Sequence, residues 1–404
     1  MQNDSRTQLN VLLMVPSFDQ GGSERQGVQL ARLLSETGRY RVTLACLDRS
    51  GMLLADAERL NLGSLPEFRL SSFYDANMLR QFRRCVALLK AQSIDVVQTF
   101  DFYTNVFGLT AAAVARVPVR IGARRNTKGH FSATQRWLER RSFHFAHVVA
   151  ANAEAVREEL IRDGVSATKV VTTYNGVNVD RVTPVASLAR AAVLGTLGLP
   201  PESEQIVSMV ANLRSAYKDH ATFLRAARIV NEALPKATFV LAGEGPLVEE
   251  MRALARQLGI GKQTFFLGRC VQVAELLSVS DVCVLSSKGG EGFSNAIIEY
   301  MIAARPVVAT DVGGAREAVA EGETGWIVSP GDHEKLAAHI IELLRDPERA
   351  RAMGARGRQV VKEKFSCEAQ LARIEDLYGQ FLPTKQITHS AKPNPTISRL
   401  ETSR

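Results

Sequence analysis

Glycines and two glutamates are concentrated in one short stretch, KGGEGFSNAIIEYM, at residues 288–301. Glu291 stands among the glycines, and Glu299 lies inside the apolar run that follows. Glycines let backbone N–H groups approach an anion closely at a helix N-terminus, whereas carboxylates accept hydrogen bonds from hydroxyl groups. The stretch therefore predicts a ligand that carries both phosphate and hydroxyl groups. The alternative is a loop that joins an ordinary helix, with one acid in its first turn and one exposed acid.

Two cations occur in a second stretch of this kind, NLRSAYKDH, which contains Arg214 and Lys218. A guanidinium with an ammonium nearby suits a diphosphate. The alternative is that both residues are solvated charges at the start of a helix. Glycine turns follow two other apolar runs, at Gly21-Gly22 and in GEGP at residues 243–246. Four such stretches at strand ends indicate a single shared cleft, because ligands of open α/β sheets bind beyond the carboxyl ends of the strands.

The elements that must position these residues form two series of alternating strands and helices. The first series begins with NVLLMVP and contains predicted helices at 23–36 and 78–91, and the second begins with QIVSMVAN. This alternation predicts an α/β protein with two doubly wound parallel sheets. We expect a first domain at 1–180, a second domain at 181–365, a closing helix at 366–382 and a disordered tail at 383–404, with the join in residues 174–190.

Composition describes an ordinary globular chain of 404 residues, 46% hydrophobic and 23% charged. No apolar run is long enough to span a bilayer, and the five cysteines show no metal-binding spacing. We therefore expect a cytoplasmic protein that needs no metal or cofactor.

The formal charge of +8 is concentrated in residues 116–141, where Glu139 is the only acid. The cations there are Arg116, Arg120, Arg124, Arg125, Lys128, Arg136, Arg140 and Arg141. No nucleic-acid-binding signature accompanies them, so nucleic acid is not expected as a partner. The segment is either a solvated face or a surface that contacts anionic lipid headgroups or a lipid-linked acceptor.

In combination, the motifs resemble those of the retaining glycosyltransferases of family 4, which have the GT-B fold. The resemblance spans roughly residues 9–381 and rests on GGSER, YNGV, NLRSAYKDH, LAGEGP, FLGR and EGFSNAIIEYM, with seven residues between Glu291 and Glu299. It implies two Rossmann-like domains that face a central cleft. It also implies a UDP- or GDP-linked sugar as the donor, held mainly by the second domain, which would be the nucleotide-sugar domain, while the first would be the acceptor-binding domain.

The resemblance assigns roles to individual residues. Arg214 and Lys218 would bind the diphosphate, Glu299 the ribose hydroxyls and Glu291 the transferred sugar. Further expected donor contacts are Gly21, Gly22, Gly243, Gly268, Arg269, Gly292, Phe293, Ser294 and Asn295. No metal ligand is expected, because cations and helix dipoles can stabilise the departing diphosphate.

The acceptor side departs from the family pattern. Many members carry a histidine near the sugar, whereas the corresponding segments here contain Gln98, Phe100 and Arg124. Asp101 is the nearest carboxylate, and it either positions the acceptor hydroxyl or caps the following helix. We group it with Glu291, Arg214 and Lys218 as a candidate catalytic residue.

The resulting hypothesis is a retaining glycosyltransferase that transfers a sugar to a glycan or lipid-linked acceptor. Surface polysaccharide, lipopolysaccharide or glycolipid would be the product. The alternatives are a sugar-nucleotide epimerase on the same fold and a nucleotide-sugar binding protein without catalytic activity. An epimerase needs several acids and histidines in the cleft, and the motifs of this chain do not supply them.

Overall fold

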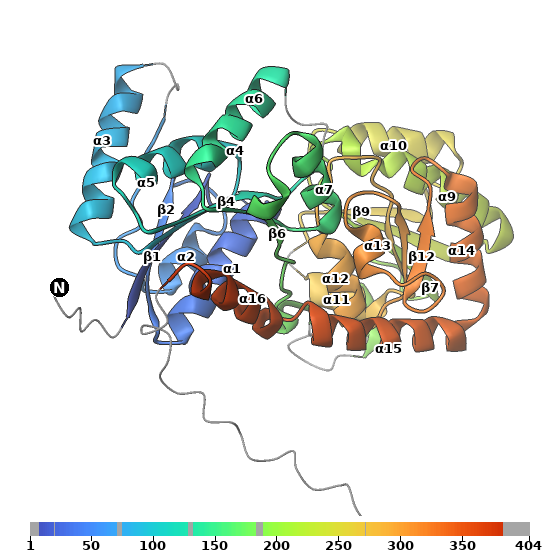
Figure 1. Ribbon diagram of the computed structural model, residues 1–404. Helices are drawn as coiled ribbons and strands as arrows, with labels where there is room; N and C mark the ends of the chain where they lie inside the picture. Colours follow the sequence, from blue (N-terminus) through green and yellow to red (C-terminus); the bar gives the residue numbers. More distant parts are fainter. Residues whose placement is uncertain are drawn as a thin grey trace, which may run out of the picture.

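Two parallel β-sheets of six strands each organise the protein, and each lies in a lobe of its own (Figure 1). The computed structural model describes residues 8–19, 21–70, 75–127, 132–182, 189–270 and 272–382. The predicted tail at 383–404 and Lys128 of the basic segment lie outside these residues. The domain boundary near residue 180 stays a prediction, since residues 183–188 lie outside them too. The predicted α/β class with two doubly wound sheets is confirmed.

The first lobe contains six strands in the order β2-β1-β3-β4-β5-β6. They are β1 (Leu9–Val15), β2 (Tyr40–Cys46), β3 (Val96–Thr99), β4 (Val119–Arg124), β5 (Val148–Ala151) and β6 (Val170–Thr172). The helices are α1 (Gly22–Glu36), α2 (Leu54–Arg59), α3 (Ala76–Ala91), α4 (Phe102–Thr104), α5 (Thr110–Val114), α6 (Ala133–Ser142) and α7 (Glu154–Arg162), with a π-helical turn at Asn105–Leu109 between α4 and α5. Helices α1 and α3 begin within two residues of their predicted starts.

The second lobe has the strand order β12-β11-β10-β7-β8-β9. Its strands are β7 (Gln205–Val210), β8 (Ala237–Ala242), β9 (Thr264–Gly268), β10 (Val282–Leu285), β11 (Val307–Thr310) and β12 (Gly325–Val328). Its helices are α8 (Arg190–Thr196), α9 (His220–Ala233), α10 (Val248–Gln257), α11 (Val273–Val279), α12 (Asn295–Ile302), α13 (Ala315–Ala318), α14 (His333–Arg345) and α15 (Pro347–Lys364), and a 3-10 turn (η5) covers Ala216–Lys218.

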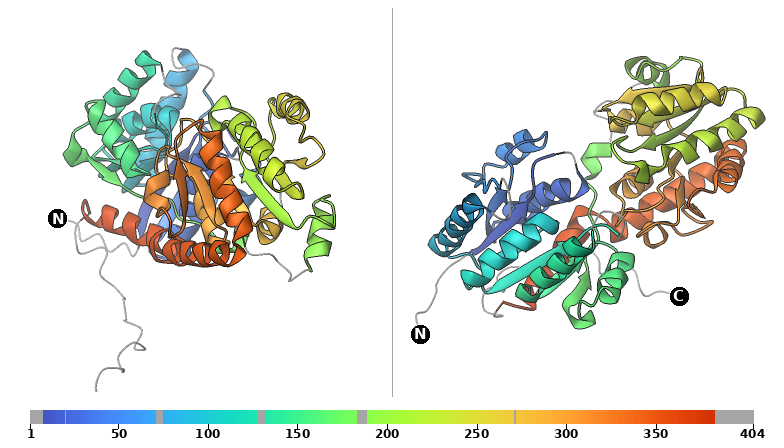
Figure 2. Two further views of the ribbon diagram at one scale, coloured as in Figure 1. Left: turned by 90° about the vertical axis from the view of Figure 1, so that its right-hand side faces the viewer. Right: turned by 90° about the horizontal axis from the view of Figure 1, so that it is seen from above.

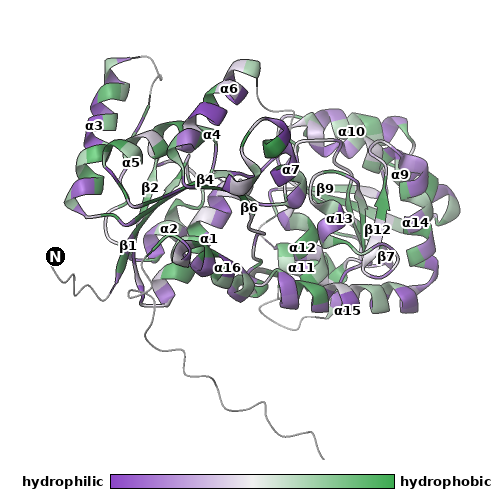
Figure 3. Cartoon of the chain, in the orientation of Figure 1, coloured by the Kyte–Doolittle hydropathy of each residue, from purple (hydrophilic) through white to green (hydrophobic). Residues whose placement is uncertain are grey.

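The strands lie between helical layers, which explains why they are apolar on both faces. All six residues of β8 are buried, as are all four residues of β10 and of β11. Colouring by hydropathy shows hydrophobic strands inside both lobes and polar residues on the outer helices (Figure 3). Parallel sheets covered by helices on both faces have this pattern.

The last helix, α16 (Cys367–Gly379), returns from the second lobe and packs under the first (Figures 1 and 2). Ile374, Leu377 and Tyr378 join the core cluster that contains β1. The hydroxyl of Tyr378 donates to Oε1 of Gln98 on β3 at 2.7 Å. The chain therefore crosses between the lobes twice, and the second crossing ties its C-terminal helix to the first sheet.

Each sheet has a switch point, where the strand order reverses. Ligands of doubly wound sheets bind beyond the strand ends at this point. In the second lobe it lies between the neighbouring strands β7 and β10, and in the first lobe between β1 and β3. The loops that follow these four strands contain residues 211–219, 286–294, 16–21 and 100–101. Most of the predicted site residues lie in or beside these loops.

Candidate active site

A cavity of about 330 Å³ lies between the lobes and is lined by residues of both. Ten of the predicted site residues line it: Gly22, Lys218, Gly243, Arg269, Glu291, Gly292, Phe293, Ser294, Asn295 and Glu299. The other predicted residues, Gly21, Asp101, Arg214 and Gly268, are not among its lining residues. The structure thus brings together the second-lobe motifs that the sequence separates by more than 70 positions.

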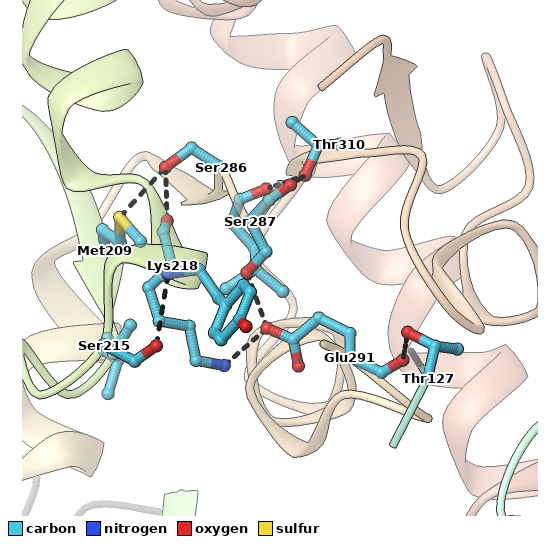
Figure 4. Close-up of polar contacts among 12 residues, drawn as sticks. Thr127, Met209, Ser215, Lys218, Ser286, Ser287, Glu291 and Thr310 are labelled. Carbon is cyan, nitrogen blue, oxygen red and sulfur yellow. Dashed lines mark hydrogen bonds and ion pairs between the residues drawn. The ribbon is translucent and has the colours of Figure 1, made fainter. Parts of the chain in front are cut away.

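Lys218 and Glu291 form an ion pair at the switch point of the second sheet, as Figure 4 shows. Nζ of Lys218 lies 2.5 Å from Oε1 of Glu291, and the hydroxyl of Ser287 donates to the same oxygen at 2.6 Å. The side chain of Glu291 is only 12% exposed. The loops after β7 and β10 therefore place one cation and one carboxylate side by side.

The backbone that carries Lys218 is fixed by local hydrogen bonds. Ser215 Oγ accepts from the amide of Tyr217 at the start of the η5 turn. Ser286 Oγ donates to the carbonyls of Lys218 and Asp219 at 3.2 and 2.9 Å. Asp219 adopts a left-handed conformation with φ of 47° and caps α9, so the chain turns sharply after the lysine. These bonds therefore fix the backbone at Lys218, and the ammonium group is held by Glu291.

The glycine loop after β10 is in close contact with the first lobe. The amide and hydroxyl of Thr127 donate to the carbonyl of Glu291 at 3.2 and 2.8 Å. A Cβ atom at Gly292 would lie 2.2 Å from the carbonyl oxygen of Arg125 and 2.4 Å from Oδ1 of Asn152. Gly292 is thus required for the lobes to approach each other, in addition to the phosphate approach that the sequence suggested.

Glu299 lies on α12 and is 4% exposed. Its Oε1 is 3.1 Å from Nη1 of Arg25, which belongs to α1 of the first lobe. One turn earlier, Oδ1 of Asn295 accepts from Asn175 at 2.7 Å and from Gln26 at 3.3 Å. Polar side chains of the first lobe therefore hold the N-terminal half of α12.

An acid and an arginine face each other at the start of α1. The carboxylate of Glu24 folds back over Gly21, where a Cβ atom would lie 2.0 Å from Oε2. Burial raises the pKa of Glu24 to about 7, and the charges of Asp101 and Asp19 act in the same direction, while Arg125 opposes them. Burial also lowers the pKa of Arg125 to about 10. Titratable groups of intermediate exposure therefore interact electrostatically at the switch point of the first lobe.

The raised pKa of Glu24 predicts a pH-dependent stability. Between about pH 4.5 and 7 the folded protein keeps Glu24 protonated while the unfolded chain ionises it, so this group makes the free energy of unfolding fall as the pH rises. Glu24→Gln removes this contribution. We expect the variant to gain roughly 1 to 3 kcal/mol relative to the parent between pH 5 and 8, measured by urea unfolding.

Glu36→Gln is the matched control, because Glu36 lies at the end of the same helix and its side chain is 56% exposed. Its stability should run parallel to that of the parent across the same pH range. Parallel curves for Glu24→Gln as well would show that Glu24 does not titrate near pH 7 in the folded protein.

Asp101 and Arg214 have local partners that account for their positions. Asp101 caps α4 by accepting from the amides of Thr104 and Tyr103 at 2.9 and 3.3 Å, and burial raises its pKa. Arg214 has a side chain that is 57% exposed and pairs with Glu244 at 2.7 Å. The capping alternative for Asp101 is therefore observed. A role of either residue with a ligand stays a prediction.

The side chains that stand where the resemblance implies a histidine have partners of their own. Gln98 binds Tyr378, and Arg124 is buried between Glu139 and Asp163, with N···O distances of 2.5 and 2.8 Å. The next residue, Arg125, lines the cavity instead, lies over the ring of Phe100 and donates to Oδ1 of Asn175. Successive side chains along a strand lie on opposite faces of the sheet. Arg124 and Arg125 at the end of β4 therefore point in opposite directions, and only Arg125 reaches the cavity.

Sequence reasoning missed several cavity residues contributed by the first lobe. They are Ser23, Arg25, Arg125, Asn126, Asn152 and Asn175. Their positions in the sequence could have indicated them, because each of these residues follows an apolar run that ends at the same edge of the sheet. Arg25 and Asn175 even lie within the quoted motifs GGSER and YNGV.

Across the described ranges, from residue 8 to residue 382 with their gaps, no cluster of three or more His, Cys, Asp or Glu side chains could hold a metal ion. In the same part of the chain, no helix combines the length and the apolarity needed to cross a membrane.

Two Rossmann-like lobes with a ligand cavity between them define the GT-B class of glycosyltransferases. A solved structure of Anabaena Alr3699/HepE in complex with UDP superimposes with a TM-score of 0.80 at 21% identity, covering 92% of this chain and 100% of that one. At this identity the likeness concerns the fold.

Two family models match successive parts of the chain. "Glycosyltransferase Family 4" matches residues 20–181, and "Glycosyl transferases group 1" matches residues 198–360. The two models together match both lobes, and the chain belongs to the group 1 glycosyltransferases with the GT-B fold, as the motifs predicted.

Two curated relatives match part of the chain. N-acetyl-alpha-D-glucosaminyl L-malate synthase of Bacillus anthracis is 35% identical over 181 residues, which is 45% of this chain and 47% of the relative. A GDP-mannose-dependent alpha-(1-6)-phosphatidylinositol monomannoside mannosyltransferase of Mycolicibacterium smegmatis is 28% identical over 211 residues, 50% of this chain and 54% of the relative. The chain thus spans about half the length of these relatives.

Proposed function

We propose that the protein is a retaining glycosyltransferase that transfers a sugar from a UDP- or GDP-linked donor to a hydroxyl group of a glycan or lipid-linked acceptor. The observation that carries this proposal is the pairing of Lys218 with Glu291 in a cavity that also contains Glu299. A cation for a diphosphate and two carboxylates for hydroxyl groups are thereby arranged along one cavity.

In this arrangement, Glu291 binds the transferred sugar and Glu299 the ribose, while Lys218 contacts the diphosphate, with Arg214 at the rim. Gly243, Gly268 and Arg269 at the ends of β8 and β9 are assigned to the base. Gly21 and Gly22 and the amides at residues 292–295 are assigned to the phosphates and the sugar. Phosphate and carboxylate binding at these loops follows from unpaired amides at helix N-termini and from the hydrogen-bonding capacity of carboxylates.

Retention of configuration without a protein nucleophile requires attack on the face from which the leaving group departs. The acceptor oxygen bonds to the anomeric carbon as the bond from that carbon to the phosphate oxygen breaks, and the acceptor proton moves to the departing diphosphate. No protein nucleophile enters this step. Lys218 stabilises the negative charge that develops on the leaving group, which is the contribution expected of a fixed cation. Asp101 remains the candidate for positioning the acceptor hydroxyl.

Support for the donor and acceptor classes comes from the relatives. HepE was crystallised with UDP. The name of one curated relative specifies a GDP-mannose donor and phosphatidylinositol monomannoside, and the name of the other specifies N-acetylglucosaminyl L-malate. Of the proposed products, surface polysaccharide, lipopolysaccharide and glycolipid, the glycolipid agrees with the first of these names.

The experiment is incubation of the purified protein with radiolabelled UDP- and GDP-sugars, with and without membrane extract and with EDTA in a parallel series. We expect label to move to lipid or glycan, with the anomeric configuration retained, in the presence of EDTA. An epimerised donor would favour an epimerase, and binding without turnover would favour a binding protein. Loss of transfer on chelation that magnesium restores would contradict a metal-independent reaction.

We also propose that helix α6 contacts an anionic membrane surface at the inner face of the membrane. Arg140 and Arg141 are exposed, Trp137 is 50% exposed, and the guanidinium of Arg141 lies 5.3 Å from the ring centroid of Trp137. Arg124 and Arg125 of the same basic segment point inward instead, so only part of the segment is available for lipid headgroups. Cations and an interfacial aromatic residue on one short helix suit such a surface.

Replacing Arg136, Arg140 and Arg141 together with Gln should weaken binding to vesicles that contain anionic lipid. Each cation near such a surface contributes about 1 kcal/mol, so the triple variant should bind at least about 10-fold more weakly at low salt. The measurement is vesicle co-sedimentation at two salt concentrations.

The matched control replaces three exposed arginines of α15 in the second lobe, Arg351, Arg356 and Arg358, with Gln. It changes the net charge by the same amount on another surface. Equal losses in both triple variants would indicate non-specific attraction, and unchanged binding of the α6 variant would mean that this helix is a solvated face.

A further inference from the structure

Arg25 on α1 pairs with Glu299 on α12, and the two helices belong to different lobes. The N···O distance is 3.1 Å, and the side chains are 21% and 6% exposed. A guanidinium this close makes a charge-assisted hydrogen bond that fixes the orientation of the carboxylate. The first lobe therefore supplies a cation to the carboxylate to which we assign the ribose.

The position of Arg25 is defined by its surroundings. A second cavity of about 410 Å³ adjoins the first, and Arg25, Asn295 and Glu299 line both. Gln26, the next residue on α1, donates to Oδ1 of Asn295 at 3.3 Å and to the carbonyl of Gly176 at 2.9 Å. The start of α1 is thus bound to α12 and to the segment after β6, and Arg25 lies at the contact between the lobes.

We propose that Arg25 is a positioning residue of the first lobe that orients the Glu299 carboxylate for the ribose across the contact between the lobes. This inference rests on the proposed function. An ionised carboxylate has about four acceptor sites, so two ribose hydroxyls can bind Glu299 while Arg25 remains in place. A guanidinium at 3.1 Å holds the carboxylate in one orientation.

The test is calorimetric titration of UDP and 2′-deoxy-UDP, and of GDP and 2′-deoxy-GDP, into the parent, Arg25→Gln, Glu299→Gln and the double variant. Arg25→Gln should weaken binding of the nucleotide about 10-fold, the effect of losing a hydrogen bond to a charged group. It should also bring the affinities of the ribose and deoxyribose forms closer together. In the Glu299→Gln background the same change should alter affinity by less than about twofold.

Two further variants make the test specific. Arg32→Gln is the matched control, since Arg32 lies on the same helix and lines the second cavity but pairs with Glu36 of its own helix at 3.1 Å. It should leave both nucleotide affinities unchanged. Arg25→Lys keeps the charge and should restore part of the lost affinity and of the ribose preference, and it replaces Arg25→Gln if that variant does not fold.

Equal losses from Arg25→Gln in both backgrounds would overturn the inference, because Arg25 would then act on the ligand independently of Glu299. Unchanged affinity of Arg25→Gln would overturn it too. If the parent binds neither UDP nor GDP, the proposed function itself fails, and that result is distinct from the other two because they require nucleotide binding by the parent.

Discussion

Lys218→Ala is expected to lower kcat/KM for the sugar donor by at least about 100-fold, the range found when a fixed group that stabilises transition-state charge is removed. Lys218 is held at the switch point of the second sheet, 30% exposed and 2.5 Å from Glu291. Both kcat and affinity for the nucleotide diphosphate should fall, because the diphosphate carries more charge at the breaking bond than in the bound donor.

Arg214→Ala should have a smaller effect than the sequence alone suggested. Its side chain is 57% exposed and pairs with Glu244. Solvent therefore screens its charge, and Glu244 already neutralises part of that charge. We expect a loss of about 10-fold or less, mainly in KM. The order of the two effects is the prediction that the structure adds.

Steady-state kinetics with the donor identified in the transfer assay would measure both variants. Lys236→Ala, at an exposed position after α9, is the matched control and should retain parental kinetics. Circular dichroism and thermal unfolding would show that the variants are folded. Activity of Lys218→Ala within about twofold of the parent would remove this residue from the site.

The fold was predictable because its determinants are local in the sequence. Apolar strands such as the run at 282–285 are buried on both faces, and the polar helices that cover them show their own period. These two patterns alternate along the chain and therefore specify parallel sheets. Helix α16 was predicted as an element, but its return to the first lobe depends on contacts of Tyr378 with Tyr40 and Gln98, which lie hundreds of residues earlier.

The candidate site was predictable on the second lobe and much less so on the first. Lys218, Glu291 and Glu299 lie in motifs with characteristic spacing. Arg25 gains its carboxylate partner only where the lobes meet, and Arg125 enters the cavity through the direction of its side chain. The preceding residue, Arg124, has the same side chain and a neighbouring position, yet it is buried among acids of its own lobe. Side-chain direction at a strand end decides between the two arginines, and composition does not reveal it.

Replacing Glu291 of the glycine loop and replacing Glu299 of the following helix should change the kinetics and nucleotide binding in different ways. If Glu299 binds the ribose as proposed, Glu299→Ala removes a contact that is equally present in the bound donor and in the transition state. Its loss should therefore appear as weaker binding of both donor and free nucleotide, with kcat affected less. The ion pair with Arg25 adds to this effect, since the variant leaves a partly buried arginine without this carboxylate.

Glu291→Ala should instead spare free nucleotide diphosphate and lower kcat, because a misplaced sugar ring misaligns the bond that breaks. The structure strengthens this expectation. Oε1 of Glu291 accepts from both Lys218 and Ser287, so removing the carboxylate releases the lysine from its anionic partner. A lysine released in this way attracts the diphosphate at least as strongly as before, and nucleotide affinity should stay constant or rise.

Calorimetric titration of free nucleotide diphosphate into Glu291→Ala and Glu299→Ala, beside their steady-state kinetics, separates the two roles. Glu291→Gln is the matched control for size, and it should share the kcat defect because an amide cannot replace both the charge and the acceptor capacity of the carboxylate. We expect kcat of Glu291→Ala to fall by about 100-fold or more. If Glu291→Ala loses nucleotide affinity as severely as Glu299→Ala, or retains full kcat, then the carboxylate beside Lys218 does not hold the sugar.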